Sequence, residues 1–313
     1  MISEYKNIRH LKKYDDESRG TNSKEWVVDN EILYLFKETQ IKEDGTSTNA
    51  HYAEAIYSDI ANLIELNCVN VKFAIRNQKK GIIAEYFLKD NEELIDFTAL
   101  IQNIRQDFQP KSLKCKKTKE YYSIQLILES VKAIISDRNL YKEIRKNIIE
   151  EIIMDALCDH YDRNPSNIAL IKNYNLNTNK RYKLSTIFDN GTCLAASLPI
   201  EITKKYLNNE FGIIELDNAI RSKIGIGEEK YTTYDLLLDF IMNNYFEDTI
   251  DIVNNINYVL DPQTINIVLN QYKYKHLDKY RKELMYKKIL FNKAKINKYF
   301  NIYYNKKQKK LVK

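Results

Sequence analysis

Two short segments near the middle of the chain hold residues whose types and spacing suit phosphoryl transfer. The first is HYDRNPSN, residues 160–167, and the second is Asp189-Asn190-Gly191. Asp162 can receive the proton of an attacking hydroxyl, while the amide of Asn167 and the carboxylate of Asp189 can bind Mg²⁺. Transfer of a γ-phosphoryl group requires mainly positioning and charge neutralisation, which these side chains can supply. The segments therefore predict a kinase-type active site.

The spacing within the first segment has a mechanical reason. Five residues from Asp162 to Asn167 allow a tight loop in which both side chains enter one cleft, and Pro165 would stiffen that loop by fixing its φ. A bare D-x-x-x-x-N pattern arises often by chance in a sequence rich in Asp and Asn. The order of the surrounding elements therefore has to support the prediction.

Alternating and short apolar runs predict strands in the N-terminal part, interrupted by one amphipathic helix. After the polar, glycine-containing run 18–24, we expect a strand over Glu31–Lys37, a helix over His51–Leu66, and strands over Val69–Ile75 and Ile82–Leu88 joined by a turn at 77–81. Lys37 ends the first of these strands, directly before the helix that carries Glu54.

Beyond about residue 90 the apolar spacing becomes helical. We expect helices with apolar residues over 94–104, over 124–134 and over Leu140–Leu157, then strands over Ile168–Ile171 and Tyr182–Phe188 on either side of the candidate loop, and further helices that include Thr232–Tyr245 and Pro262–Tyr274. The change predicts an α+β fold with two lobes, a small β-rich N-lobe over 1–89 and a mostly helical C-lobe over 90–313.

The composition excludes several classes of protein. The four cysteines lie far apart without a C-x-x-C pair, so neither a zinc site nor a disulfide framework is indicated. The N-terminus has no apolar signal region, and no segment approaches the ~18 apolar residues of a membrane span. We expect a soluble protein without a cleavable signal, and export by a route that needs no signal stays open.

Positive charge is concentrated at the C-terminal end. Residues 272–313 hold 15 Lys or Arg and 2 acids, a net +13, which leaves −7 for residues 1–271 of a chain whose total is +6. The cluster Lys306-Lys307-Gln308-Lys309-Lys310 fits a nuclear-import signal or contact with nucleic acid or an anionic surface. A solvated terminal helix explains the same charges, and we favour that interpretation.

Together these segments resemble the protein-kinase-like superfamily, in which the catalytic loop H-x-D-x-x-x-x-N precedes a metal-binding Asp followed by Gly. His160, Asp162, Pro165 and Asn167 fit that loop. The chain is most similar to the HipA-like kinases, whose G-x-Q-x-K phosphate loop is approximated by Gly20-Thr21-Asn22-Ser23-Lys24. Within that group it resembles the cell-translocating kinase A type of bacterial Ser/Thr kinase. That resemblance implies a protein of the bacterial cytoplasm, or one translocated into a host cell by a route that needs no signal.

The resemblance implies a role for each matching position. Lys37 would contact the α- and β-phosphates of ATP, with Glu54 as its ion-pair partner. The alternative is that Glu54 is a surface carboxylate of its helix, and we favour the ion pair. Asp162 would orient the substrate hydroxyl and accept its proton, and Asn167 and Asp189 would bind Mg²⁺. The nucleotide would also contact the phosphate loop, Gly20, Thr21, Asn22, Ser23 and Lys24, and a hinge formed by Glu85, Tyr86 and Phe87.

The sequence departs from the pattern of regulated protein kinases. Tyr161 replaces the arginine that reads a phosphorylated activation loop, and Asn190 replaces the Phe of D-F-G. No A-P-E-like segment follows Gly191. We therefore expect a catalytic loop without the usual activation switch. Ser18, Thr21 and Ser23 are either autophosphorylation sites or hydroxyls that make local turns.

The sequence leaves three functions open. The first is an ATP- and Mg²⁺-dependent Ser/Thr protein kinase that acts on a protein hydroxyl and autophosphorylates. The second keeps the fold and changes the reaction, to phosphorylation of a lipid or small molecule or to transfer of AMP. The third is a non-catalytic binding module that uses its basic tail.

Overall fold

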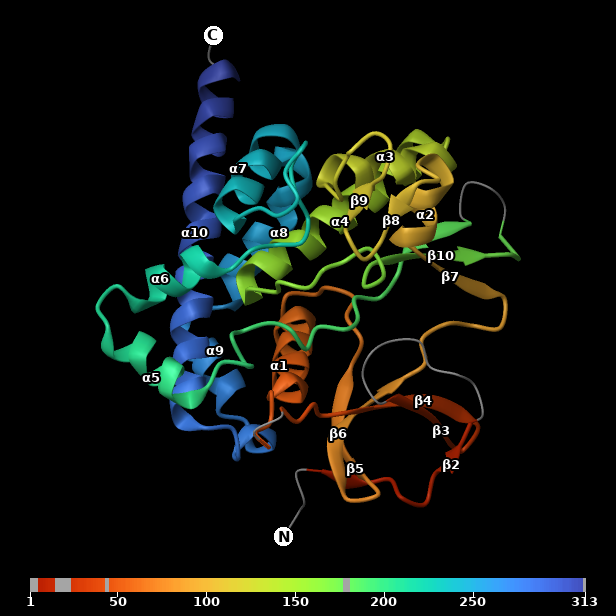
Figure 1. Ribbon diagram of the computed structural model, residues 1–313. Coiled ribbons are helices and arrows are strands. Elements are labelled where there is room, and N and C mark those ends of the chain that lie inside the picture. The colour runs from red at the N-terminus through yellow and green to blue at the C-terminus, as the bar shows by residue number, and fades with distance from the viewer. Residues whose placement is uncertain (1–4, 15–23, 43–44, 177–180, 312–313) are drawn as a thin grey trace.

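The computed structural model describes residues 5–14, 24–42, 45–176 and 181–311. Its N-terminal part is a curled six-stranded sheet of order β1-β5-β6-β4-β3-β2, in the lower part of Figure 1. β1 pairs with β5 in parallel, and the other neighbours are antiparallel. The strands are β1 (Lys6–Asn7), β2 (Lys12–Lys13), β3 (Lys24–Asp29), β4 (Ile32–Glu38), β5 (Val71–Arg76) and β6 (Lys79–Glu85).

The two faces of this sheet have different neighbours because side chains alternate along a strand. Phe36 and Ile83 face a small core on one side. Ile82 faces the main core on the other side, which also holds the buried residues of helix α1 (Ala50–Leu63). Lys37 follows Phe36 and is paired with Ile82 across the strands, so its side chain lies on the α1 side.

The hairpin between β5 and β6 is tighter than the predicted five-residue turn. Asn77 and Gln78 form it alone, with φ values of 48° and 66°, and two positive φ values match the twist of the flanking strands. Gly81 lies inside β6 instead of in the turn. A Cβ at Gly81 would lie 2.1 Å from the carbonyl oxygen of Lys37, so the strand that carries this lysine needs a glycine beside it.

The prediction of a helix from residue 94 is wrong over its first residues. Glu92–Asp96 form strand β7, which pairs with β10 (Ala169–Asn173), and β10 pairs in turn with β11 (Tyr182–Leu184). Helix α2 (Phe97–Ile104) begins only after Asp96, whose side chain accepts a hydrogen bond from the backbone N–H of Ala99. The partner strand lies more than 70 residues downstream, so local apolar spacing could not reveal it.

Helices make up the rest of the fold, in the upper part and along the left side of Figure 1. The predicted helices near 124–134, 140–157 and 232–245 are confirmed. Pro262 occupies the first turn of its helix as expected, but that helix ends at Leu269, and Tyr272–Tyr274 form a separate 3₁₀ helix. The elements are β8 (Phe108–Gln109), β9 (Lys114–Cys115), α3 (Ile124–Ile134), α4 (Arg138–Cys158), α5 (Ile200–Asn208), α6 (Gly212–Ala219), α7 (Tyr234–Asn244), α8 (Phe246–Val259), α9 (Pro262–Leu269), the 3₁₀ helix η2 (Tyr272–Tyr274) and α10 (Lys279–Leu311). The expected α+β class is confirmed.

The long basic helix α10 is packed against the fold for much of its length. It contacts α4, α5, α7 and α8, and Lys288 is completely buried. The ammonium group of Lys288 lies 2.9 Å from Asp217 and 3.3 Å from Asp159, and Lys295 contacts the same Asp217. These charges are part of the core, whereas Lys306 near the end of the helix is exposed.

None of the described helices is both long and apolar enough to cross a membrane. The four cysteines are free and buried, in agreement with the absence of a predicted disulfide framework.

Candidate functional site

Three of the predicted site residues meet in one ion cluster between the sheet and the helices. Nζ of Lys37 on β4 lies 2.8 Å from Oε2 of Glu54 on α1 and donates a second hydrogen bond to Oδ1 of Asp189. Glu54 is buried, and only about a tenth of its carboxylate side chain reaches solvent. The structure therefore brings together Lys37, Glu54 and Asp189, which lie far apart in the sequence, and places Glu54 in the interior and not on the helix surface.

Lys24 reaches the same cluster. It begins β3 directly opposite Lys37 of β4, so both side chains project from the same face of the sheet. Its Nζ lies 3.9 Å from Oδ2 of Asp189. Lys24 was expected in a loop and is the first residue of a strand that the sequence analysis missed. Gly20, Thr21, Asn22 and Ser23, with Ser18, lie outside the described residues.

The charges in this cluster shift one another's pKa. Burial acts to lower the pKa of Lys37, but the carboxylates of Glu54 and Asp189 outweigh it and raise that pKa well above its ordinary value. Burial also raises the pKa of Glu54. For Asp189 the nearby ammonium groups of Lys37 and Lys24 overcome burial and lower the pKa. Asp189 is thus ionised at neutral pH, as a metal-binding carboxylate must be.

Below this cluster, Arg163 holds the candidate loop in place from inside the protein. Its guanidinium is fully buried and makes two 2.8 Å hydrogen bonds to Asp155 of α4. It also donates to the carbonyl oxygen of Asn167 at 2.8 Å and to that of Phe188 at 3.1 Å. One side chain therefore connects the end of the loop with the residue before Asp189. Arg163 lies inside the catalytic-loop motif, but the motif gives it no role.

His160 fastens the beginning of the same loop. Its ring is completely buried, and Nε2 donates to the carbonyl oxygen of Asp189, 3.4 Å away. Burial lowers the pKa of His160 to about 4, helped by the charge of Arg163 and opposed by Asp155. The ring is therefore neutral at pH 7 and acts as a hydrogen-bonding brace.

Residues before His160 are held by the last helix. Asp159 ends α4 with a positive φ of 53°, and its Oδ1 accepts a hydrogen bond from Asn292 of α10 at 2.9 Å. Asn292 also donates to the carbonyl oxygen of Leu157 at 3.1 Å. With Lys288 beside Asp159, α10 fixes the geometry from which the loop departs.

Asp162 and Asn167 lie at the two ends of the exposed part of the loop. Asn167 donates from Nδ2 to the backbone carbonyl oxygen of Asp162 at 3.1 Å, which closes the loop. Its amide oxygen accepts a hydrogen bond from the hydroxyl of Ser166 at 3.3 Å and has a second lone pair for a metal ion. Oδ1 of Asp162 accepts a hydrogen bond from Asn164 at 3.3 Å. About 29% of the Asp162 side chain is exposed, so an incoming hydroxyl can reach it.

Lys223 also contacts Asp162 and was not foreseen. Its Nζ donates to Oδ1 of Asp162 from the segment between α6 and α7. Sixty-one residues separate the two side chains, and no motif marks Lys223 in the sequence. Only the fold reveals that a lysine stands at the carboxylate expected to accept the substrate proton.

The predicted hinge follows the end of β6. Glu85 is the last residue of β6 and pairs with Tyr34, and the backbone N–H of Tyr86 donates to the carbonyl oxygen of Leu33 at 2.9 Å. The ring of Phe87 stacks on that of Phe188, with centroids 6.1 Å apart. Phe87 therefore lies beside the residue that precedes Asp189, while the Tyr86 amide is already engaged within the protein.

The position of Asn190 gives a physical reason for the missing aromatic switch. Its Oδ1 accepts a 2.8 Å hydrogen bond from Arg163, and the residue is buried. An amide tied into a buried network cannot swing out as the Phe of D-F-G does in regulated kinases.

The oxygen donors at the site fit Mg²⁺, which prefers carboxylate and amide oxygens together with phosphate. Among the described residues no cluster of three or more His, Cys, Asp or Glu forms a self-sufficient metal site. Asp189 and Asn167 alone would leave most of the coordination shell to phosphate and water, as is usual for Mg²⁺ that arrives with a nucleotide.

A curled sheet and a long helical region, with a lysine–glutamate pair on one side and an Asp–Asn loop on the other, define a protein-kinase-like fold. The chain has this fold. It is similar to the crystal structure of the Helicobacter pylori proinflammatory kinase CtkA, with a TM-score of 0.78 and 19% sequence identity over 96% of this chain and 98% of that chain. The predicted resemblance is thereby confirmed for the fold.

A second solved structure supports the same fold over part of its length. It is the Shewanella oneidensis MR-1 toxin–antitoxin system HipA and HipB with its operator DNA, with a TM-score of 0.52 and 13% identity over 86% of this chain. This chain spans 58% of that one. No protein-family model and no curated protein sequence matches the chain.

Proposed function

We propose that this protein is an ATP-dependent protein kinase that transfers the γ-phosphoryl group of ATP to a serine or threonine hydroxyl, with residues 1–89 as N-lobe and 90–313 as C-lobe. One observation carries the proposal. Lys37 of the sheet contacts both Glu54 of α1 and Asp189, which follows the candidate catalytic loop. A lysine held between those two carboxylates, with an Asp–Asn loop beside it, is the arrangement that phosphoryl transfer by kinases requires.

The two lysines of the sheet supply the charge for binding phosphate. In this structure Lys37 and Lys24 both lie against Asp189, so the arriving triphosphate would replace a carboxylate as their partner. Glu54 then keeps Lys37 in position, because the pair is nearly closed to water. Bound Mg²⁺ would be held by Asp189 and Asn167 and would neutralise charge on the phosphates.

The loop supplies the groups that act on the acceptor. Asp162 would orient the hydroxyl and take up its proton as the oxygen attacks the γ-phosphorus and the bond to the β-phosphate oxygen breaks. Lys223, beside Asp162, would face the transferred phosphoryl group. His160 and Arg163 touch no reacting atom in this scheme and act as positioning residues.

The test is phosphorylation by the purified full chain with γ-labelled ATP and Mg²⁺. We expect incorporation into the protein itself or into a Ser/Thr substrate, and loss of it in Asp162→Asn and in Asp189→Asn. Asp251→Asn is a matched control, because that carboxylate is largely exposed on α8. Circular dichroism checks that all three variants fold. Equal labelling by the wild type and both site variants would contradict the assignment.

The mass of the product separates the alternatives within the same fold. Addition of one phosphate to a protein supports the proposal, whereas addition of a whole nucleotide indicates transfer of AMP. Phosphate found only on a lipid or small molecule would indicate a lipid or small-molecule kinase. The third alternative, a binding module using the basic tail, has less support because Lys288 and Lys295 are neutralised inside the fold.

A further inference from the structure

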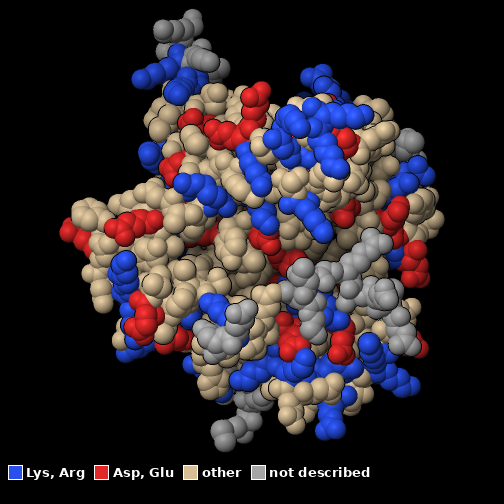
Figure 2. Space-filling model, in the orientation of Figure 1, with Lys and Arg blue, Asp and Glu red and all other residues tan. Residues whose placement is uncertain are grey.

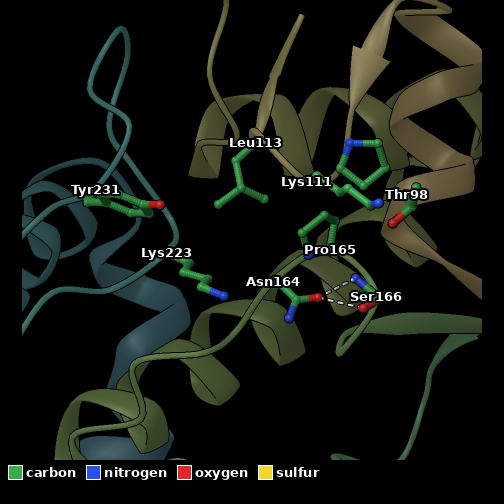
Figure 3. Close-up of a pocket in the computed structure, with 9 residues that line it drawn as sticks. Thr98, Lys111, Leu113, Asn164, Pro165, Ser166, Lys223 and Tyr231 are labelled. Atoms are coloured by element: carbon green, nitrogen blue, oxygen red, sulfur yellow. Dashed lines mark hydrogen bonds between the residues drawn. The ribbon is translucent and has the colours of Figure 1, made fainter. Parts of the chain in front are cut away.

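A hollow of about 290 Å³ lies beside the candidate catalytic loop. Figure 3 shows that four parts of the chain border it: the loop itself, Thr98 of α2, the β8–β9 region, and the segment that carries Lys223 and Tyr231. Its lining comprises Thr98, Pro110, Lys111, Leu113, Asn164, Pro165, Ser166, Lys223 and Tyr231. Since Lys223 contacts Asp162, a chain that presents a hydroxyl to Asp162 would pass through or beside this hollow.

The border of the hollow is strongly basic. Residues 111–119, which include β9, contain five lysines and no acid. The facing residues 221–231 contain Arg221, Lys223 and Lys230 against Glu228 and Glu229. The two segments together therefore have a net charge of +6. Figure 2 shows Lys and Arg side chains gathered over this part of the face, above the seam between sheet and helices.

Four of these lysines are exposed and lack a carboxylate partner within the described part of the chain: Lys111, Lys116, Lys117 and Lys119. The acids nearest in sequence are used elsewhere. Glu120 and Glu129 both pair with Arg105, and Asp107 accepts a hydrogen bond from the backbone N–H of Lys117. Unpaired lysines at this density repel one another, so an anionic partner would relieve a cost that the folded chain carries alone.

We propose that this basic surface, Lys111, Lys116, Lys117 and Lys119 with the hollow beside them, docks an acidic segment of the protein substrate. The inference rests on the proposed function, because it assigns the substrate class of the same site. Carboxylates of an extended segment would contact the lysines. Less polar side chains would enter the hollow against Pro110, Leu113 and Pro165, and the acceptor hydroxyl would then reach Asp162.

The shape and chemistry of the surface favour an acidic peptide over other anions. Proteins bind single-stranded nucleic acids by stacking the bases on open aromatic side chains. Here Nζ of Lys114 donates to the hydroxyl of Tyr121 at 2.8 Å, and Nζ of Lys230 lies 4.9 Å from the centroid of Tyr231, so each ring is already in contact with a lysine. A lipid surface would leave the hollow unused, whereas a peptide side chain fills it.

Binding is tested first, without any phosphoryl transfer. A fluorescent twelve-residue peptide with one Ser among Glu and Asp is titrated with the full chain, beside a peptide with Gln and Asn at the same places. We expect only the acidic peptide to bind, more weakly as salt rises. The triple variant Lys111→Ala, Lys116→Ala, Lys117→Ala should raise its Kd about tenfold, since each exposed charge pair contributes about two- to threefold.

A matched triple variant controls for net charge. Lys72→Ala, Lys142→Ala and Lys205→Ala remove three exposed lysines from β5, α4 and α5 and should leave the Kd unchanged. Oligouridine and vesicles with phosphoinositide are titrated in parallel. An equal Kd for wild type and the Lys111 triple variant would overturn the proposal. So would loss of RNA or vesicle binding in that variant with peptide binding intact.

Phosphorylation then separates this inference from the proposed function. With wild type we expect a higher kcat/KM for the acidic peptide than for the neutral one, and the Lys111 triple variant should lose that preference through KM. Labelling that depends on Asp162 without any acidic preference would overturn the docking surface and leave the kinase proposal standing. Acidic-peptide binding that the triple variant loses, without labelling by wild type, would reject the kinase proposal and retain the surface.

Discussion

Two groups of charges support the candidate site, and they differ in their access to water. In the first, Lys37, Glu54 and Asp189 meet between sheet and helices, and 31% of the Asp189 side chain is exposed. In the second, Arg163 lies between Asp155 and Glu151, and none of the three is more than 2% exposed. A ligand can reach the first group and replace one of its ion-pair partners. No ligand or water can reach the second group, so its ion pairs have no replacement partner.

The difference in exposure predicts different roles for the two groups, one in activity and one in stability. A buried ion pair holds its geometry because loss of one partner leaves an uncompensated charge in the interior. A pair that opens to solvent loses less, because water and a ligand can replace the missing partner. Arg163 should therefore matter most for stability, and Lys37 most for activity.

The largest effect on stability is expected from Arg163→Met. The change leaves Asp155 and Glu151 buried without their cation and also removes donors to the carbonyl oxygens of Asn167 and Phe188. We expect a loss of about 3–5 kcal/mol in the free energy of unfolding, measured by urea denaturation. Arg221→Ala, an exposed arginine, should change stability by no more than about 0.5 kcal/mol. A loss as small for Arg163→Met would remove the contrast between the groups.

Lys37→Met should have the opposite profile. Activity with ATP should fall about 100-fold, or about 2.7 kcal/mol in barrier, because a donor aimed at the reacting phosphates is lost. The free energy of unfolding should fall by about 2 kcal/mol or less. Asp189 remains accessible to water, and the buried Glu54, whose pKa burial already raises, can take up a proton once its cation is gone. Steady-state kinetics and denaturation on the same preparation compare the two numbers. Full activity in a folded Lys37→Met protein would break the assignment of the first group.

The neutral His160, whose Nδ1 lies 3.7 Å from Asp155 of the second group, predicts a pH dependence of stability. The pKa of His160 is about 4 in the folded protein against an ordinary value of 6.5. Its contribution to stability is therefore complete above pH 6.5 and is lost as pH falls towards 4, because the unfolded chain gains a proton that the folded protein refuses. Between pH 4 and 6.5, His160→Asn should therefore reduce the slope of the free energy of unfolding against pH by about 1.4 kcal/mol per pH unit.

Urea denaturation at several pH values gives the free energy of unfolding at each pH, and hence that slope. His51, whose pKa burial lowers to about 3, contributes in the same direction and remains in the variant. An unchanged slope in His160→Asn would mean that the ring takes up its proton without unfolding the protein.

The smallest effect is expected at the contact between Gly191 and α1. A Cβ there would lie 3.2 Å from Cβ of Ala50 and 3.4 Å from Oε2 of Glu54, so α1 would have to shift by a few tenths of an ångström. Gly191→Ala should cost about 1 kcal/mol or less in stability and raise the KM for ATP by disturbing Glu54. A KM equal to that of wild type would show that the first group tolerates such movement.

Much of the fold followed from local patterns. The strand that carries Lys37, the helix that carries Glu54, and α4 before the candidate loop were predicted because each has a clear apolar period over a sufficient length. β3 was not predicted because it begins at Lys24, the last residue of a polar, glycine-containing run that is typical of a loop. β7 was missed because its pairing with β10 is formed far along the chain.

Site residues that belong to a sequence motif were predicted. Residues that join the site only through their position in the folded chain were not. The expected ion pair of Lys37 with Glu54 is found. Asp189 joins it through a contact with Lys37 that was not predicted, and the roles of the three residues in binding ATP and Mg²⁺ remain predictions. Lys223 had no motif, and Arg163 stood inside one without a role. Both act through partners that the fold supplies, so no reading of neighbouring residues could identify them.

The attachment of α10 to Asp159 has a consequence for the order of folding. The bond from Asn292 to Asp159 spans 133 residues, so it forms only after a large loop has closed, and such contacts arise late. Until α10 docks, the residue that leads into His160 lacks its support. The chain should therefore acquire its secondary structure before it acquires a working loop, and regain of activity should follow regain of circular dichroism during refolding.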